Sequence, residues 1–339
     1  MAFDNLLSDW RQRALGFESA LQGVMVGMHD PIRLLLVAVF ARGHVLLEGD
    51  VGVGKTTLLR ALARGLGGHY ERVEGTIDMM PADLLYHTYV DEQGRPRVEP
   101  GPLIRWGEDL ATFFFNEINR ARPQVHSTLL RVMAERSVHA FNREYRFPHL
   151  LVFADRNRVE REETFELPAA ARDRFLMELA IEAPSAPAAQ KALMFDTRFH
   201  DVDRLIDAVP AGLVPYAALD ALAVSLQQSV HVSAALQDYV LALWNTVRHP
   251  DRAGLTLPGI DVASLVAAGG SPRGMSFLVR AARVHAWLAG RDMVVPEDVQ
   301  RVFGAVVAHR VFLTPIHEAR RERILPLLLD AAFAAVPAP

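Results

Sequence analysis

The sequence has no cysteine among its 339 residues, and this absence removes several kinds of chemistry at once. Disulfide bonds, thiolate zinc sites, iron–sulfur clusters and a thiol nucleophile are all excluded. Long apolar runs are also missing, because the longest, residues 34–41, is far shorter than the roughly 18–20 residues of a membrane helix. The N-terminal segment lacks the basic stretch followed by an apolar one that marks a secretion signal. We therefore expect a soluble, cytoplasmic protein without a membrane span.

A large excess of one charge sign is lacking as well. The 36 Lys and Arg residues nearly balance the 40 Asp and Glu residues, and the formal net charge is −4. A general nucleic-acid binder needs a basic excess to neutralise phosphates, so we expect no nucleic-acid partner. The length is sufficient for about two domains, each with its own core.

The order of apolar runs predicts an α/β fold followed by a helical region. Short, almost continuously apolar runs predict buried strands at residues 44–48, 111–115, 150–154 and 176–182. Such runs are typical of a parallel sheet covered by helices on both faces. After a Pro/Ser/Ala segment at 183–187, helical spacing dominates, at residues 219–226, 234–247, 274–288 and 297–307. We therefore predict an α/β domain at 1–185 and an all-helical domain at 186–339.

A glycine-rich turn follows the first predicted strand. It matches the phosphate-binding pattern G-x-x-x-x-G-K-[ST] without a mismatch and is followed by a predicted helix. In such a loop the backbone N–H groups surround the phosphates, the lysine contacts the β- and γ-phosphates, and the hydroxyl binds Mg²⁺. We expect ATP to be bound by Gly49, Asp50, Val51, Gly52, Val53, Gly54, Lys55, Thr56 and the adjacent Thr57.

The second predicted strand ends in a polar pair that suits ATP hydrolysis. Glu117 is the candidate general base, since a carboxylate at a strand end can reach the water that attacks the γ-phosphate. Asn116 occupies the metal-side position, where an ATPase usually has an aspartate. Its amide oxygen can accept a bond from a metal-bound water but carries no charge, so we expect weaker Mg²⁺ binding.

Together, five segments of the chain resemble the MoxR family of AAA+ ATPases. They occur in the order expected for that family, at residues 44–56, 78–84, 117–121, 167–175 and 271–274. The resemblance implies a P-loop αβα core with a parallel sheet and an all-α lid domain. Residues 86–102 resemble the helix-2 insert of this group, and residues 137–148 resemble the hairpin that precedes its sensor-1 strand.

The resemblance also implies roles for three further residues. Asn157, at the tip of the strand at 150–154, resembles the sensor-1 residue that orients the attacking water. Arg174 resembles the arginine finger that reaches the γ-phosphate bound by a neighbouring subunit, with Arg172 as the competing candidate. Arg273 resembles the sensor-2 arginine of the lid. A guanidinium suits both arginine roles because it is always charged and forks onto phosphate oxygens.

The implied function is chaperone-like remodelling or maturation of protein clients. The implied assembly is a ring, commonly a hexamer, with a von Willebrand factor A-domain protein as adaptor. Asn116, Val51 and Arg158 depart from the family pattern, which usually has Asp, Pro and Pro at these positions. Two alternatives therefore stay open, a hydrolysis-impaired nucleotide-binding scaffold and a magnesium-chelatase-type motor subunit.

Overall fold

The computed structural model of the protein describes residues 2–157 and 165–339, so Arg158 lies outside the described residues. Contacts between residues divide the chain into two compact units. The first comprises Met1–Phe175 and Leu179–Leu222, and the second comprises Leu176–Glu178 and Ala223–Pro339. The last strand of the large sheet ends shortly before residue 185, whereas the contacts of the first unit continue through Leu222.

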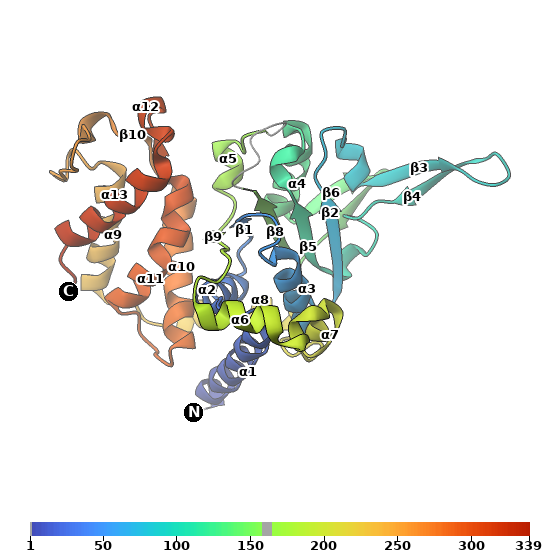
Figure 1. The fold of residues 1–339 in the computed structure, drawn as a ribbon, viewed down its shortest axis with the longest axis horizontal. Coiled ribbons are helices and arrows are strands. Elements are labelled where there is room, and N and C mark those ends of the chain that lie inside the picture. Colours follow the sequence, from blue (N-terminus) through green and yellow to red (C-terminus); the bar gives the residue numbers. More distant parts are fainter. Residues whose placement is uncertain (1, 158–164) are drawn as a thin grey trace. The chain divides into compact units, whose positions relative to one another are not determined.

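A five-stranded sheet with the order β2-β5-β8-β1-β9 forms the centre of the first unit (Figure 1). The β2–β5, β5–β8 and β8–β1 pairs are parallel, as expected for an α/β fold. Its strands are β1 (Val45–Glu48), β2 (His69–Glu74), β5 (Leu110–Asn116), β8 (Leu151–Arg156) and β9 (Met177–Ala180). The predicted apolar strands are confirmed as β1, β5, β8 and β9. Edge strand β2 was not predicted, because its sequence is half-exposed and largely polar and contains no apolar run.

Alternation along the central strands explains how helices cover the sheet. Phe113 and Phe115 of β5 belong to a buried cluster that includes Leu129 and Val132 of α4. Since side chains alternate along a strand, Phe114 faces the opposite side, and α3 contacts β5 and β2. The helices of this unit are α1 (Ala2–Val24), α2 (His29–Phe40), α3 (Lys55–Leu66), α4 (Pro123–Glu135), α5 (Ala169–Arg172), α6 (Pro187–Phe195), α7 (Val202–Asp207) and the first turn of α8 (Leu219–Ser229).

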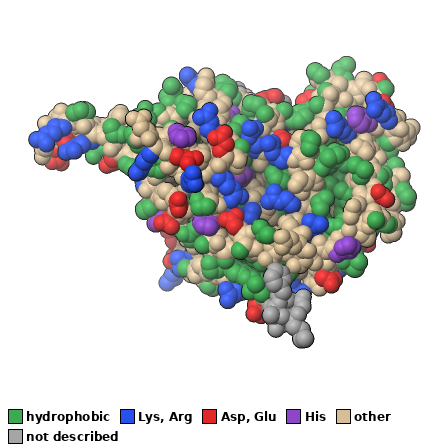
Figure 2. All heavy atoms as spheres, turned by 180° about the vertical axis from the view of Figure 1, so that it is seen from behind, with side chains coloured by type: hydrophobic (Ala, Val, Ile, Leu, Met, Phe, Trp, Pro, Cys, Tyr) green, Lys and Arg blue, Asp and Glu red, His purple; other side chains and the backbone are tan. Residues whose placement is uncertain are grey.

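Two antiparallel hairpins interrupt the α/β pattern where the sequence predicts them. Strands β6 (Ser137–Ala140) and β7 (Arg143–Arg146) form the shorter one. Strands β3 (Tyr86–Val90) and β4 (Pro96–Pro100) form the longer one, which we call the β3–β4 arm. The arm extends away from the rest of the first unit (Figure 1), and hydrophobic and basic side chains lie along it (Figure 2).

The base of the β3–β4 arm is a tight junction. The Gly101 N–H donates to the Leu85 oxygen at 2.7 Å, and the Leu103 N–H donates to the Leu84 oxygen at 3.0 Å. A Cβ at position 101 would lie 2.6 Å from the Leu85 carbonyl carbon, so only glycine allows the two chain segments to approach this closely. The chain therefore enters and leaves the arm at nearly the same place.

The second unit is helical, as predicted, with one small addition. Its complete helices are α9 (Ala234–Arg248), α10 (Pro272–Leu288), α11 (Pro296–Val307), α12 (Pro315–Glu318) and α13 (Arg321–Ala335). The addition is an antiparallel pair of short strands, β10 (Val266–Ala268) and β11 (Phe312–Leu313). Across residues 2–157 and 165–339, no helix combines the length and apolar character needed to cross a bilayer.

Gly65→Ala tests the packing of α1 on α3. A Cβ at position 65 would lie 2.1 Å from the Phe17 ring, which is fully buried. We expect a loss of about 1–3 kcal/mol of stability, because an overpacked core must shift. Gly16→Ala on α1 is the matched control, since nothing lies within 4 Å of its added Cβ. In urea unfolding followed by circular dichroism, the control should have the wild-type midpoint or a higher one. The higher midpoint would correspond to a gain of up to about 1 kcal/mol in the free energy of unfolding. Equal midpoints for the two variants would contradict the packing.

Candidate functional site

A cavity of about 360 Å³ lies where the carboxyl ends of β2, β5 and β8 meet the loop that follows β1. In α/β sheets, ligands commonly bind at this edge. The residues that line the cavity are Val51, Gly52, Gly54, Lys55, Thr56, Thr57, Arg72, Glu74, Asn116, Glu117, Asp155 and Asn157. It therefore brings together the predicted lysine, hydroxyl, strand-end pair and sensor asparagine. Gly49, Asp50 and Val53 belong to the same loop but are not among the lining residues.

The loop after β1 has a shape that two of its glycines permit. A Cβ at Gly49 would lie 2.2 Å from the Ile181 oxygen, so the chain passes too close there for any side chain. Gly54 has φ +94°, in the left-handed region, and is the N-cap of α3. The loop thus leads directly into a helix N-terminus, where backbone N–H groups and the helix dipole favour phosphate.

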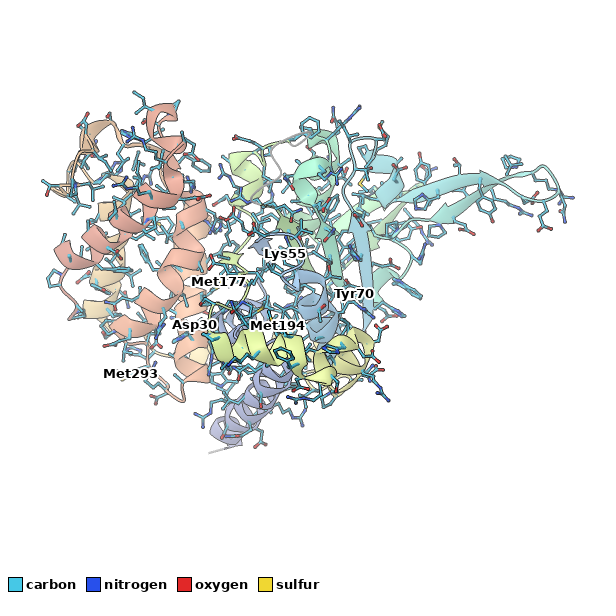
Figure 3. The ribbon with its side chains drawn as sticks, viewed as in Figure 1. Asp30, Lys55, Tyr70, Met177, Met194 and Met293 are labelled. Atoms are coloured by element: carbon cyan, nitrogen blue, oxygen red, sulfur yellow. The ribbon has the colours of Figure 1, made fainter. Side chains whose placement is uncertain are left out.

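Lys55 is buried at the first position of α3, with only 7% of its surface exposed (Figure 3). Its ammonium donates to the Gly49 oxygen at 2.7 Å and to Asn157 Oδ1 at 2.7 Å. The same nitrogen lies 3.0 Å from Asp155 Oδ2. A buried cation is held here by three oxygen partners, one from the loop after β1 and two from the end of β8.

Glu117 follows β5 in an uncommon backbone conformation. Its φ of 53° and ψ of 49° lie in the left-handed region, which costs a non-glycine residue about 1 kcal/mol or more. Its N–H donates to Asp155 Oδ1 at 2.5 Å, which offsets part of this cost. Its carboxylate accepts from Asn157 Nδ2 at 3.2 Å and from Arg120 at 2.9 Å. The candidate base and sensor residues are therefore hydrogen-bonded to each other.

His126 of α4 fixes the turn that follows Glu117. Burial lowers the pKa of the His126 ring below its usual value, which favours the neutral form of the ring. Its Nε2–H donates to the Ile118 oxygen at 2.6 Å. A neutral, buried histidine thus holds the backbone beside the candidate base.

Asp155 is the main feature of the cavity that sequence reasoning missed. It is 1% exposed, and burial raises the pKa of its carboxyl, although the Glu117 N–H and the Lys55 ammonium act in the opposite direction. Arg72 and Glu74 of β2 also line the cavity and were missed, because β2 was not recognised as a strand. The usable signal for Asp155 was its place directly after the apolar run of β8.

The two candidate finger residues lie outside this cavity. Arg174 follows α5, is half-buried, and donates to the Ala170 oxygen at 2.6 Å. Arg172 is the last residue of α5. Neither is among the cavity's lining residues. Arg273 belongs to the second unit, at the start of α10, whose N-cap Ser271 accepts from the Gly274 N–H at 3.2 Å.

The donor atoms of the cavity fit a hard cation that arrives with a phosphate ligand. Thr56, Asn116, Glu117 and Asp155 offer hydroxyl, amide and carboxylate oxygens, the donors that Mg²⁺ prefers. Across the described part of the chain, no group of three or more His, Asp and Glu side chains is arranged as a metal site. Mg²⁺ in proteins usually keeps several waters and takes its other ligands from substrate phosphates.

Comparisons of sequence with known families match two parts of the chain. Residues 44–177 match the ATPase family associated with various cellular activities (AAA), and residues 260–326 match the AAA lid domain. The first match contains every residue that lines the cavity.

Individual relatives match over nearly the whole length. The chain is 63% identical to Protein MoxR of Methylorubrum extorquens, over 99% of this chain and 98% of that protein. It is 35% identical to Chaperone MoxR1 of Mycobacterium tuberculosis, over 89% of this chain and 76% of that protein. A crystal structure from Cytophaga hutchinsonii, of a protein proposed to be an ATPase, has a TM-score of 0.80 and 26% identity, with 97% of this chain and 96% of that chain covered.

Lys55→Met should weaken nucleotide binding about 100-fold, since hydrogen bonds to charged groups contribute roughly 1.5–3 kcal/mol each. The measurement is titration with a fluorescent ATP analogue, with a thermal melt to show that the variant is folded. Lys191→Met is the control, because Lys191 is exposed on α6 and is the only other lysine in the sequence. Equal affinities for the two variants would remove Lys55 from the phosphate site.

Proposed function

Because this chain belongs to the MoxR family of AAA+ ATPases, we propose that it hydrolyses ATP with Mg²⁺ and uses the reaction to remodel or mature client proteins. The proposal rests on one observation, which is that a single cavity brings the required groups together. It presents a lysine and a hydroxyl at a helix N-terminus together with a carboxylate and an amide at two strand ends. These are the groups that phosphoryl transfer to water requires.

In the proposed reaction, the loop N–H groups and Lys55 hold the phosphates of ATP. Mg²⁺, when bound, would neutralise charge on the phosphate oxygens, and Thr56 and Asn116, which line the cavity, are the residues that would hold it or its waters. Glu117 accepts a proton from the attacking water. Asn157 keeps that water and the Glu117 carboxylate in line, since its amide already donates to Glu117 Oε1.

The assembly we propose is a closed ring, with the hexamer as the form expected from the family resemblance. Arg174 then completes the site of the neighbouring subunit, which is consistent with its place outside its own cavity. Arg273 of the second unit reports the nucleotide state to the lid. Protein clients and a von Willebrand factor A-domain adaptor follow from the resemblance alone, as does location in the cytoplasm.

A nucleotide-binding scaffold is the second candidate, and Asn116 is the observation that favours it. Asn116 lines the cavity where a carboxylate would bind the Mg²⁺ shell more strongly. Phosphate release by the wild-type protein separates the two functions. Turnover that depends on Mg²⁺ supports the ATPase, whereas tight ATP binding without measurable turnover supports the scaffold.

Glu117→Gln should reduce turnover by at least about 100-fold while ATP affinity stays within about threefold of wild type, because general-base catalysis contributes roughly 10²–10⁴-fold. Phosphate release and nucleotide titration measure the two quantities. Gln keeps the size of the side chain and its acceptor for Asn157. Glu92→Gln, at the exposed tip of the β3–β4 arm, is the control and should match wild type. Unchanged turnover in Glu117→Gln would show that another group is the base.

Arg174→Ala should lower turnover about 10³-fold, as expected when an arginine finger is removed. If a neighbouring subunit supplies the finger, two inactive variants should restore activity when they are mixed.

When Arg174→Ala and Glu117→Gln subunits are mixed equally in a randomly assembled closed ring, about a quarter of the interfaces contain both an intact Arg174 and an intact Glu117. Turnover should therefore reappear in the mixture. Loss of activity in Arg172→Ala but not in Arg174→Ala would move the role to Arg172, and a monomer in all nucleotide states would exclude a finger in trans.

A further inference from the structure

The strand order of the sheet brings a carboxylate next to Asn116, which has an amide in place of the usual carboxylate. Strand β8 lies between β5 and β1, and Phe115 of β5 is the register partner of Ala154 of β8. The next residues along these parallel strands are Asn116 and Asp155, so they lie side by side at the same edge. Both line the cavity together with Thr56. A negative charge is therefore present at this edge, one strand away from its usual place.

Asp155 needs a cation, because an uncompensated buried carboxylate is strongly destabilising. The side chain is 1% exposed. One oxygen accepts from the Glu117 N–H, and the other lies 3.0 Å from the Lys55 ammonium. In the structure, Lys55 supplies the balancing charge.

Binding of ATP changes this balance. Lys55 is the residue that must contact the β- and γ-phosphates, so its charge becomes shared with the triphosphate. Asp155 then requires a second cation at the same edge. A divalent ion bound together with ATP would supply such a charge, and a carboxylate such as Asp155 would accept hydrogen bonds from its water ligands.

We propose that Asp155 is the acidic residue of the Mg²⁺ site, in place of a carboxylate at position 116, and that the Asp155 carboxylate pairs with Lys55 when no metal is bound. This role rests on the Mg-ATP binding proposed above. In this arrangement Asp155 on β8 carries the negative charge that position 116 on β5 usually carries, and Asn116 is its neutral neighbour. The cavity then holds a metal-side acid, Asp155, and a separate base, Glu117, on neighbouring strands.

The test compares ATP affinity in Mg²⁺ with ATP affinity in EDTA. The variants are Asp155→Asn, Asn116→Asp, and the double variant Asn116→Asp/Asp155→Asn, which returns the charge to β5. The control is Asp203→Asn. Asp203 also pairs with a cation from α3, Arg60, at 2.8 Å, but on the surface. Isothermal titration gives both affinities, and thermal melts check folding.

We expect Asp155→Asn to lose at least about 10-fold of the affinity that Mg²⁺ adds in the wild type. Its affinity in EDTA should stay equal or increase, because Lys55 no longer pairs with a carboxylate. The double variant should recover the Mg²⁺ effect to within about threefold of wild type. Asp203→Asn should keep the full effect, whereas Asn116→Asp alone adds a second carboxylate beside Asp155 and should increase it.

Two results would overturn the role of Asp155. One is a full Mg²⁺ effect in Asp155→Asn. The other is loss of ATP binding in both Mg²⁺ and EDTA in Asp155→Asn and in the double variant, which would make Asp155 a structural partner of Lys55. Failure of the wild type to bind ATP in either condition would instead refute the proposed ATPase function. The two failures are therefore distinguishable.

Discussion

The buried pairing of the Lys55 ammonium with the Asp155 carboxylate is the interaction on which the phosphate-binding edge depends. Lys55 begins α3 and so fixes the end of the glycine-rich loop, while Asp155 belongs to β8 and also accepts from the N–H of Glu117 after β5. One pair thus joins the loop, the central strand and the segment that carries the candidate base. Because both charges are buried, neither can be removed alone without leaving the other uncompensated.

Features whose cause is local could be predicted from the sequence. The phosphate-binding loop was visible because its glycines and Lys55 stand at fixed spacing between an apolar strand and a helix. The helices of the second unit were visible because their apolar residues recur at helical spacing, and α9, α10 and α11 are confirmed. The two hairpins carried turn residues between alternating segments. In each case the information lay within about 15 neighbouring residues, the range over which periodicity acts.

Features whose cause is the assembly of distant strands could not be predicted in the same way. Asp155 is 100 residues from Lys55 and looked like the polar end of a core strand. Only the strand order, with β8 between β5 and β1, brings it beside Asn116 and Lys55. Arg72 and Glu74 depend on β2, an edge strand whose exposed side needs no apolar residues. Reading Asn116 by itself therefore suggested a site poorer in negative charge than the one the sheet assembles.

The junction at the base of the β3–β4 arm has a consequence for how such a protein can diversify. Because the chain enters and leaves the arm at one hydrogen-bonded point beside Gly101, a longer, shorter or differently charged arm leaves the strands of the main sheet in register. Loop-closure entropy changes only slowly with length, so such changes carry little thermodynamic penalty. Selection can therefore alter the length and charge of the arm while the cavity at the edge of the main sheet stays intact, and the two parts can evolve at separate rates.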